Sequence, residues 1–354
     1  MATLQDYRNE RLRKRQELLD LGYDLYPSKA NRTHQAGQIT AQFSELEGQT
    51  VTVAGRIVKI RKFGKIAFVV LKDFSGEVQV FLKKDDLKPA DVAQNTIDMA
   101  SLRLLDSGDF VEAVGVVGKT QTGETSVLAQ SVRLLTKTLR PLPEELTNKE
   151  ERFRRRYLDI NLNPEVRDRY IRRSKFWQAT RDFLNSRGFV EINTSILEHT
   201  TGGADANPFV THMDALDEDF YLRISHELPL KRLIGAGYEK VYDIGHRFRN
   251  ENYSDEHLPE HVAMEWYWAY ANWQDGMRMM EEMYKYVLEQ TFGKLQFKLG
   301  EFEVDMSGKW EVWDYATTIN QRYDIDIFET DMAELQRIMR ENGLEVEKAD
   351  NRAR

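Results

Sequence analysis

Five short runs in which apolar and polar residues alternate constrain the fold of this chain most strongly. They lie between residues 51 and 135 and read VTVAGRIVKI, IAFVVLKD, EVQVFLKK, DFVEAVGVVGKT and SVLAQSVRLL. Alternation with period two is typical of a strand with one buried face. Turn-forming triplets such as Phe74-Ser75-Gly76 separate the runs. The sequence therefore predicts a small, closed β-barrel of five strands in this region.

A closed barrel of five strands is the architecture of an OB-fold, which commonly binds oligonucleotides. The first predicted hairpin mixes basic and aromatic side chains: Lys59, Arg61, Lys62, Phe63, Lys65 and Phe68. This mixture suits a single-stranded nucleic acid, because cations attract phosphates and rings stack on bases. The ordinary solvated edge of a β-domain explains the same pattern, so both interpretations stay open.

The chain is long enough for two domains, since 354 residues exceed the size at which a single core usually stops growing. We expect an exposed helix and a lead-in over residues 1–48, followed by the OB-fold over residues 49–140. Residues 141–165 begin with two prolines and include a basic block, and we interpret them as a linker and entry segment. Residues 166–354 form the second domain.

The second domain shows helix and strand patterns without a common nucleotide-binding loop. Helical patterns cover residues 165–187 and 274–291. Between them, FVEINTSIL, FYLRIS, KVYDIGHRF and HVAMEWYW are strand-like. Neither GxGxxG nor GxxxxGK followed by Ser or Thr occurs. We expect an antiparallel sheet flanked by helices, which together with the barrel makes the chain α+β.

The net charge of −8 is unevenly divided along the chain. Residues 1–140 carry 21 Lys and Arg against 17 Asp and Glu, and the remainder carries 29 against 41. A basic first part suggests an anionic partner such as a nucleic acid, although a solvated surface of mixed charge accounts for the same numbers.

The composition also excludes several classes of protein. The chain has no cysteine, which rules out disulfide frameworks, thiol nucleophiles and cysteine zinc sites. The charged N-terminus lacks the apolar core of a signal peptide, and no apolar run approaches the ~20 residues that span a bilayer. We therefore expect a cytoplasmic protein without a membrane partner.

Two groups of polar residues in the second domain are candidates for ligand binding. Arg247, Arg249 and Glu251 alternate along a strand-like run, so their side chains share one face and suit a nucleotide. A surface ladder of salt bridges is the competing interpretation. Glu265 and Tyr267 also share a face, within an apolar and aromatic run. A carboxylate in such surroundings needs a cation, either an internal arginine or a substrate amine.

Two further features complete this candidate site. Glu227, in the run ISHELPLKRL, is another carboxylate at the corner between a strand and a helix. The Gly202-Gly203 turn allows the backbone to approach a ligand closely. The residues alone support a site for a small cationic ligand and an anionic phosphate.

The run from TTGGADANPF to HRFRNEN, continued by HVAMEWYWAYANW, resembles the catalytic domain of class II lysyl-tRNA synthetases. RFRNE resembles the motif 2 strand and loop of that class. The leading helix, the barrel, the linker and the RRRYLDI entry follow in the same order as in the family. The ELPLKRL and MEWYWAY segments favour lysine over the aspartyl and asparaginyl relatives, which share the barrel.

The resemblance implies a role for each matching residue. Arg249 would be catalytic and hold the ATP α-phosphate and the substrate carboxylate. The remaining ATP-binding positions are Glu251 at the adenine amine, His257 near the outer phosphates and His261 against the adenine ring. Lysine-binding positions are Gly203, Glu227, Glu265 and Tyr267. Anticodon-binding positions are Lys65, Phe68, Gln79 and Glu124, which would stack on unpaired bases or contact them by hydrogen bonds.

The resemblance also implies ATP and Mg²⁺ as cofactors, tRNA(Lys) and L-lysine as partners, and a homodimer. The family continues beyond the position that matches Arg354, so we expect a catalytic domain that is incomplete at its C-terminus. The expected Mg²⁺ ligands and motif 3 would lie there. Three departures are Asn193-Thr194-Ser195 in place of the usual motif 1 end, Glu256 where an arginine is usual, and His261 where a phenylalanine usually stacks on adenine. A non-catalytic tRNA-binding fragment or paralogue, and an aspartyl or asparaginyl enzyme, remain alternatives.

Overall fold

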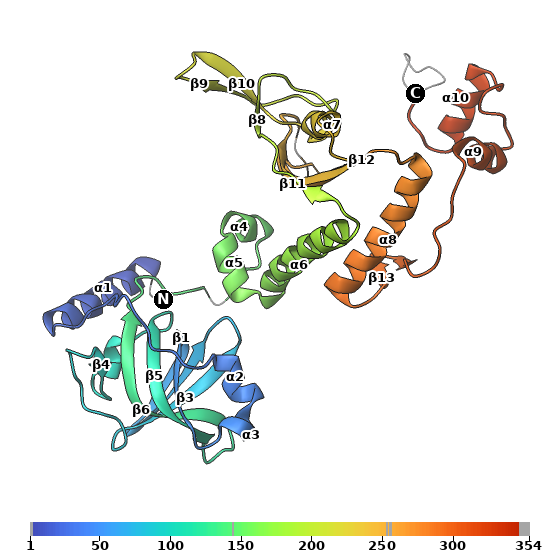
Figure 1. The fold of residues 1–354 in the computed structure, drawn as a ribbon. Helices are drawn as coiled ribbons and strands as arrows, with labels where there is room; N and C mark the ends of the chain where they lie inside the picture. Colours follow the sequence, from blue (N-terminus) through green and yellow to red (C-terminus); the bar gives the residue numbers. More distant parts are fainter. Residues whose placement is uncertain (1–2, 144, 253, 255–256, 347–354) are drawn as a thin grey trace. The chain divides into compact units, whose positions relative to one another are not determined.

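The computed structural model describes residues 3–143, 145–252, 254 and 257–346. The chain divides into two compact units, residues 1–164 and 165–354 (Figure 1). Each unit has a hydrophobic core of its own, and the two are described in turn.

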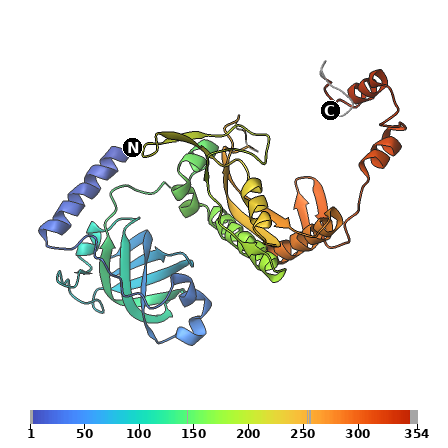
Figure 2. The same cartoon turned by 45° about the horizontal axis from the view of Figure 1, so that its top comes forward.

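The first unit contains the predicted barrel (Figure 2). Its strands are β1 (Thr50–Phe63), β2 (Ile66–Lys72), β3 (Glu77–Lys83), β4 (Thr96–Ile97), β5 (Phe110–Lys119) and β6 (Thr125–Thr136). Their order is β3-β2-β1-β5-β6-β4, and a parallel pairing of β3 with β6 closes the barrel. The five predicted strands are confirmed, with β4 as a short addition.

The alternation seen in the sequence places one side of each strand in the barrel core. Val78, Val80 and Leu82 of β3 are at most 2% exposed, while the residues between them are half-buried. At Gly55 a Cβ atom would lie 2.7 Å from the carbonyl oxygen of Lys72, so β1 and β2 approach more closely there than a side chain permits.

Helices cover parts of the barrel. They are α1 (Leu4–Asp20), α2 (Ala36–Ala41), α3 (Phe43–Leu46) and the 3₁₀ helix η1 (Ser101–Leu104). Arg11 of α1 is buried and donates to Thr138 Oγ1, to the Arg140 carbonyl and to the Ser107 carbonyl at 2.8–3.0 Å. Two of these bonds attach α1 to the chain that leaves β6, and the third attaches it to the loop before β5.

Two short helices, α4 (Lys149–Arg154) and α5 (Arg156–Leu162), end the first unit. The buried carboxylate of Asp159 accepts hydrogen bonds from Arg152 Nε at 2.7 Å and Arg156 Nη1 at 2.5 Å. The basic block of the entry segment is therefore partly used in holding these two helices together.

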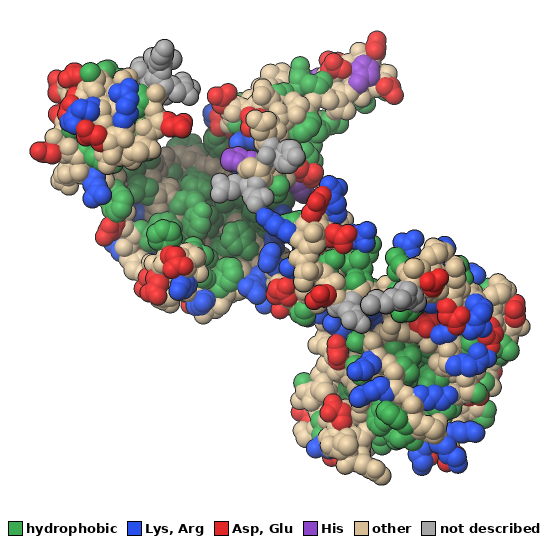
Figure 3. All heavy atoms as spheres, turned by 180° about the vertical axis from the view of Figure 1, so that it is seen from behind, with side chains coloured by type: hydrophobic (Ala, Val, Ile, Leu, Met, Phe, Trp, Pro, Cys, Tyr) green, Lys and Arg blue, Asp and Glu red, His purple; other side chains and the backbone are tan. Residues whose placement is uncertain are grey.

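The second unit is built around a three-stranded sheet in the order β12-β11-β7. Its strands are β7 (Val190–Glu191), β11 (Lys240–Phe248) and β12 (Glu260–Trp268). Helices α6 (Pro164–Ser186) and α8 (Trp273–Phe292) share a core with β11, which includes Phe183, Tyr242 and Met283. Both helices agree with the predicted ranges. β12 is an edge strand, and all but its first residue are half-buried. Figure 3 shows hydrophobic side chains gathered over one face of this unit.

The remaining elements of the second unit are smaller. They are β8 (Leu197–Glu198), β9 (Val210–Met213), β10 (Glu218–Leu222), α7 (Glu227–Gly235), β13 (Gln296–Leu299), β14 (Phe302–Asp305), α9 (Tyr315–Tyr323) and α10 (Met332–Glu341). β8, β10 and β9 form one sheet, and β13 pairs with β14. No described helix has the length and apolar character needed to cross a membrane.

The prediction of one strand over FVEINTSIL is wrong. The segment contains two short strands, because β7 pairs with β11 whereas β8 pairs with β10. Between them, the backbone N–H and hydroxyl of Thr194 donate to Asp243 Oδ2 at 3.1 and 2.6 Å. These bonds to a side chain take Thr194 out of the ladder and turn the chain from one sheet to the other.

Candidate active site and nucleic-acid interface

The register of β11 and β12 places the predicted polar residues on one face. Asp243 lies opposite Glu265, and Arg247 lies opposite His261. Since side chains alternate along a strand, these residues and Tyr267 point to the same side of the sheet. The opposite side carries the residues that pack on α6 and α8. We call the first side the polar face; its members are Asp243, Arg247, His261, Glu265 and Tyr267.

Glu265 lies at the centre of the polar face. Its Oε1 accepts from Ser225 Oγ at 3.0 Å, from the backbone N–H of His226 at 3.3 Å and from Arg247 Nη1 at 3.2 Å. Burial alone would raise the pKa of Glu265, but the contacts with His226 and Ser225 hold that pKa below its usual value. The cation that the sequence required is therefore present within the protein, as Arg247.

Asp243 of the polar face belongs to a buried ion pair that the sequence analysis did not single out. Arg223 Nη1 lies 2.9 Å from Asp243 Oδ2, and both residues are at most 2% exposed. Arg223 also donates to the His246 carbonyl at 2.7 Å and to Thr194 Oγ1 at 2.8 Å. In the sequence, the carboxylate of Asp243 within the apolar run KVYDIG indicates such a pair, because a buried carboxylate needs a cation.

Glu227, Gly203 and Tyr267 lie at the N-terminus of α7. Glu227 Oε1 is 2.6 Å from Lys231 Nζ, one turn along the helix. Burial and the negative charge of Glu227 raise the pKa of Tyr267 to about 12, which keeps its hydroxyl protonated as a donor. Gly203 has φ +86°, and a Cβ atom there would lie 2.6 Å from Glu227 Cβ and 2.9 Å from Ser225 Oγ. The glycine turn thus lies directly against this corner.

Arg249 follows β11, and its backbone N–H donates to the Pro259 carbonyl at 2.9 Å. Its Nε is buried and has no hydrogen-bond partner among the described residues. The positive charge of Arg249 contributes to lowering the pKa of both Arg247 and His261, after burial in each case, so the three groups share one neighbourhood. An unpartnered buried guanidinium donor is suited to an anionic ligand.

The other predicted nucleotide-binding residues are His261, Glu251 and His257, and they differ in their exposure and in the contacts that hold them. Arg247 Nε lies 2.8 Å from His261 Nε2, so the His261 ring is held by that arginine. Glu251 is exposed, and its Oε1 accepts from the backbone N–H of Asn207 at 3.4 Å. His257 is exposed and bonded to Ser254. Glu256 lies outside the described residues.

His226 is a second feature that the sequence analysis missed. It is fully buried, and its Nδ1 lies 3.6 Å from Glu265 Oε1 while its Nε2 lies 4.0 Å from Asp243 Oδ2. Its position between the two carboxylates links the polar face to the buried ion pair. A histidine at a strand-to-helix corner is common, and no sequence signal separates this one from others.

The barrel has a polar hollow of about 390 Å³ on the outer side of β1, β2 and β3. Arg61, Gln79 and Glu124 line it, and Gln79 Nε2 donates to Ser126 Oγ at 3.0 Å. Arg61 lies over the Phe68 ring at 5.9 Å. The structure thus places two predicted anticodon residues, Gln79 and Glu124, in one hollow, which we call the base-side hollow. Phe68 does not line it and adjoins it through the contact of its ring with Arg61. Lys65 lines a different hollow.

Comparison with known proteins assigns both units. Residues 148–346 match the family of tRNA synthetases class II (D, K and N), and residues 51–135 match the OB-fold nucleic acid binding domain. This chain belongs to the class II tRNA synthetase family.

Individual relatives carry a more specific name. The chain is 38% identical over 356 residues to the lysine–tRNA ligase of Thermosipho melanesiensis. The aligned region covers 98% of the chain and 70% of that relative. It is 41% identical to the lysine–tRNA ligases of Clostridium perfringens and Roseiflexus sp., over 96% and 97% of the chain. The matched region covers 67% and 71% of those two relatives.

Proposed function

We propose that this chain joins L-lysine to tRNA(Lys) in an ATP-dependent reaction through a lysyl-adenylate. The names and identities of the relatives support lysine as the amino acid. The single structural observation that carries the proposal is the buried Nε of Arg249, which has no partner among the residues that the structure describes and lies beside a face that contains Glu265 and Tyr267. It provides one anion-binding group next to groups that bind an amine.

Lysine recognition is assigned to the corner between α7 and β12. Its substrate carries two ammonium groups, which need carboxylates and hydroxyls with free acceptor capacity. Glu227, Glu265 and Tyr267 provide these, and the Gly203 backbone approaches the same corner. In the proposed complex, the α-ammonium displaces Lys231 from Glu227, since that surface ion pair is weak.

ATP is assigned to the neighbourhood of Arg249. Its guanidinium would contact the α-phosphate, Glu251 the adenine amine, His257 the outer phosphates and His261 the adenine ring. We expect Mg²⁺ to accompany ATP. The described residues contain no cluster of three or more metal-binding side chains, so no ligand of the ion is assigned within them.

The proposed reaction has two steps. A carboxylate oxygen of lysine attacks the ATP α-phosphorus, the bond to pyrophosphate breaks, and Arg249 neutralises charge on the phosphorus oxygens. A terminal hydroxyl of tRNA then attacks the adenylate carbonyl, and AMP leaves. Orientation and charge stabilisation by the site provide most of the rate in such a mechanism.

The first unit is assigned to the anticodon. Phe68 would stack on an unpaired base, and Gln79 and Glu124 would contact base edges in the base-side hollow. Lys65 would contact the RNA from its own hollow. We propose a homodimer in the cytoplasm as the working form.

Lysine-dependent exchange of labelled pyrophosphate into ATP, measured on this 354-residue chain, tests the proposal. We expect exchange with lysine and none with aspartate or asparagine. Arg249→Ala should lower the exchange at least 100-fold, because one preorganised charge contact to a transition state contributes about 3 kcal/mol.

Arg337→Ala is the matched control, because Arg337 is an exposed arginine paired with Glu334 and Glu341 on α10. Its exchange should equal that of the unsubstituted chain. Exchange with another amino acid overturns the assigned substrate. Binding of tRNA without any exchange would instead favour a non-catalytic tRNA-binding protein.

A further inference from the structure

A strongly basic hollow of about 520 Å³ lies beside the tip of the β1–β2 hairpin. Its lining includes four lysines, Lys62, Lys65, Lys84 and Lys88, and a single carboxylate, that of Asp98. We call it the lysine hollow. It shares no lining residue with the base-side hollow.

Backbone contacts bring the four lysines together from separate segments. Lys84 follows β3, and its N–H donates to the Lys65 carbonyl at 2.9 Å. The N–H of Lys88 donates to the Gln130 carbonyl of β6 at 2.8 Å. Lys62 Nζ donates to the Met99 carbonyl at 2.9 Å, which holds its ammonium group beside the hollow. The arrangement is therefore determined by the barrel rather than by flexible side chains alone.

The four lysines of this hollow form no ion pair with a carboxylate of the described part of the chain. Among the described residues, none of the four ammonium groups has a carboxylate oxygen within 4 Å, whereas neighbouring Lys83 pairs with Asp86 at 3.3 Å. Asp98 Oδ1 accepts instead from the backbone N–H of Ser101 at 2.8 Å. Four like charges around one hollow repel one another and attract a multivalent anion.

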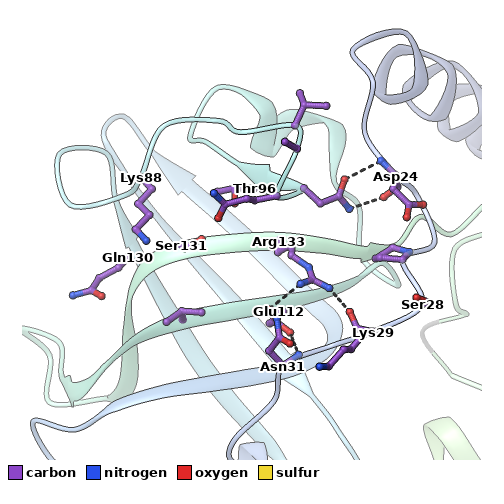
Figure 4. A pocket seen from close by; sticks show the side chains of 16 residues that line it. Asp24, Ser28, Lys29, Asn31, Lys88, Thr96, Glu112, Gln130, Ser131 and Arg133 are labelled. Carbon is purple, nitrogen blue, oxygen red and sulfur yellow. Dashed lines mark hydrogen bonds and ion pairs between the residues drawn. The ribbon is translucent and has the colours of Figure 1, made fainter.

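A second hollow of about 520 Å³, on the outer side of β5 and β6, is a neighbour of the lysine hollow, because Lys88 lines both. Figure 4 shows this second hollow, with Lys88 at one side and Arg133 near its centre. Arg133 Nη1 lies 3.7 Å from Glu112 Oε1, its Nη2 donates to the Lys29 carbonyl, and its buried Nε has no partner among the described residues. Lys29 and Arg133 thus extend the row of cations from Lys88, beside the two carboxylates that line this hollow, Asp24 and Glu112.

We infer that the lysine hollow and the neighbouring hollow around Arg133 bind the phosphate backbone of the RNA whose bases meet the base-side hollow. The inference rests on the proposed function. The β1–β2 hairpin separates the two surfaces: Arg61 and Phe68 are cross-strand partners on the base side, and the next residue, Lys62, points to the lysine hollow. Phosphates carry no sequence information, so this contact acts on any base sequence.

The test measures the dissociation constant of a tRNA transcript at several salt concentrations between 50 and 200 mM. The triple variant Lys62→Gln, Lys84→Gln, Lys88→Gln removes three of the four lysines and leaves Lys65, which has an assigned anticodon role. We expect the slope of log K against log salt to fall in magnitude by about 2 to 3, and affinity at low salt to drop at least 10-fold. The loss should be the same for a transcript with an altered anticodon.

The matched control is Lys72→Gln, Arg103→Gln, Lys119→Gln, which removes three cations from the first unit outside all three hollows. The slope of log K against log salt for this control should differ from that of the unsubstituted chain by no more than the loss of about one phosphate contact produces. An unchanged slope in the first variant, or a loss confined to one anticodon sequence, overturns the inference. Failure of the unsubstituted chain to bind tRNA contradicts the proposed function instead, so the two failures are distinguishable.

Discussion

At the scale of single residues, the buried pair of Arg223 and Asp243 holds the site in place. The pair joins the end of β10 to the middle of β11, and Thr194 adds the segment between β7 and β8. Of these groups, Asp243 belongs to the polar face that meets the substrate in the proposed complex. Arg223 and Thr194 do not. Their effect is to determine where β11 places Arg247 and Arg249.

We expect Asp243→Asn to destabilise the second unit by about 3–5 kcal/mol, because it leaves the Arg223 guanidinium buried without a charged partner. Urea unfolding followed by tryptophan fluorescence measures this. All six tryptophans of the chain lie in the second unit, so the signal reports on it alone. The exposed Asp219→Asn should stay within about 0.5 kcal/mol of the unsubstituted chain, and an equal effect of both variants would contradict the assigned role of the pair.

At the scale of elements, the corner between the glycine turn and α7 determines the shape of the proposed lysine site. Gly203 combines a positive φ with contact distances that leave no room for a side chain. Ser225 also joins the corner to the sheet, because its Oγ both donates to Glu265 and accepts from the backbone N–H of Glu227 at 3.1 Å. A shift of the turn therefore moves Glu227 relative to β12.

Gly203→Ala should weaken lysine binding at least 10-fold, since the new Cβ displaces Glu227 and the backbone pays about 1–2 kcal/mol for its left-handed conformation. Calorimetric titration with lysine measures the change. Gly235→Ala, in the last turn of α7, is the control: nothing lies within 4 Å of its Cβ position, and alanine favours helix by about 1 kcal/mol. Unchanged lysine affinity in Gly203→Ala would rule out this turn as part of the site.

At the scale of the whole molecule, the chain contains two separate cores. One is formed by residues between Leu18 and Leu134 and the other by residues between Ala179 and Val287. No buried residue belongs to both clusters among the residues that the structure describes. Residues that share one hydrophobic core unfold together. Each unit is therefore expected to unfold in one cooperative step.

Heating should therefore produce two transitions by calorimetry, and tryptophan fluorescence should follow only one of them. Lysine and ATP together should raise the midpoint temperature of the transition that fluorescence follows, because a ligand stabilises the unit that binds it. An RNA with the lysine anticodon should raise the midpoint temperature of the other transition, which belongs to the first unit. A single transition in which fluorescence and heat absorption coincide would show that the two cores unfold together.

Much of the fold follows from local patterns in the chain. The period-two runs between residues 51 and 135 became β1, β2, β3, β5 and β6, and the helical patterns became α6 and α8 within one or two residues. The run FVEINTSIL was interpreted wrongly, because a side-chain bond from Thr194 to Asp243 interrupts it and no local pattern reports such a bond. Alternation also predicted that Glu265 and Tyr267 share a face.

The internal cation that contacts Glu265 could be identified only in the assembled sheet. Arg247 is 18 residues away in the chain and reaches Glu265 only because β11 and β12 pair in this register. The same holds for the lysine hollow, where four lysines of one ordinary charged surface converge because β1, β2, β3 and β6 close into a barrel. Periodicity depends on neighbours along the chain and is visible in the sequence. Convergence of charges depends on long-range pairing, and it therefore appears only in the folded protein.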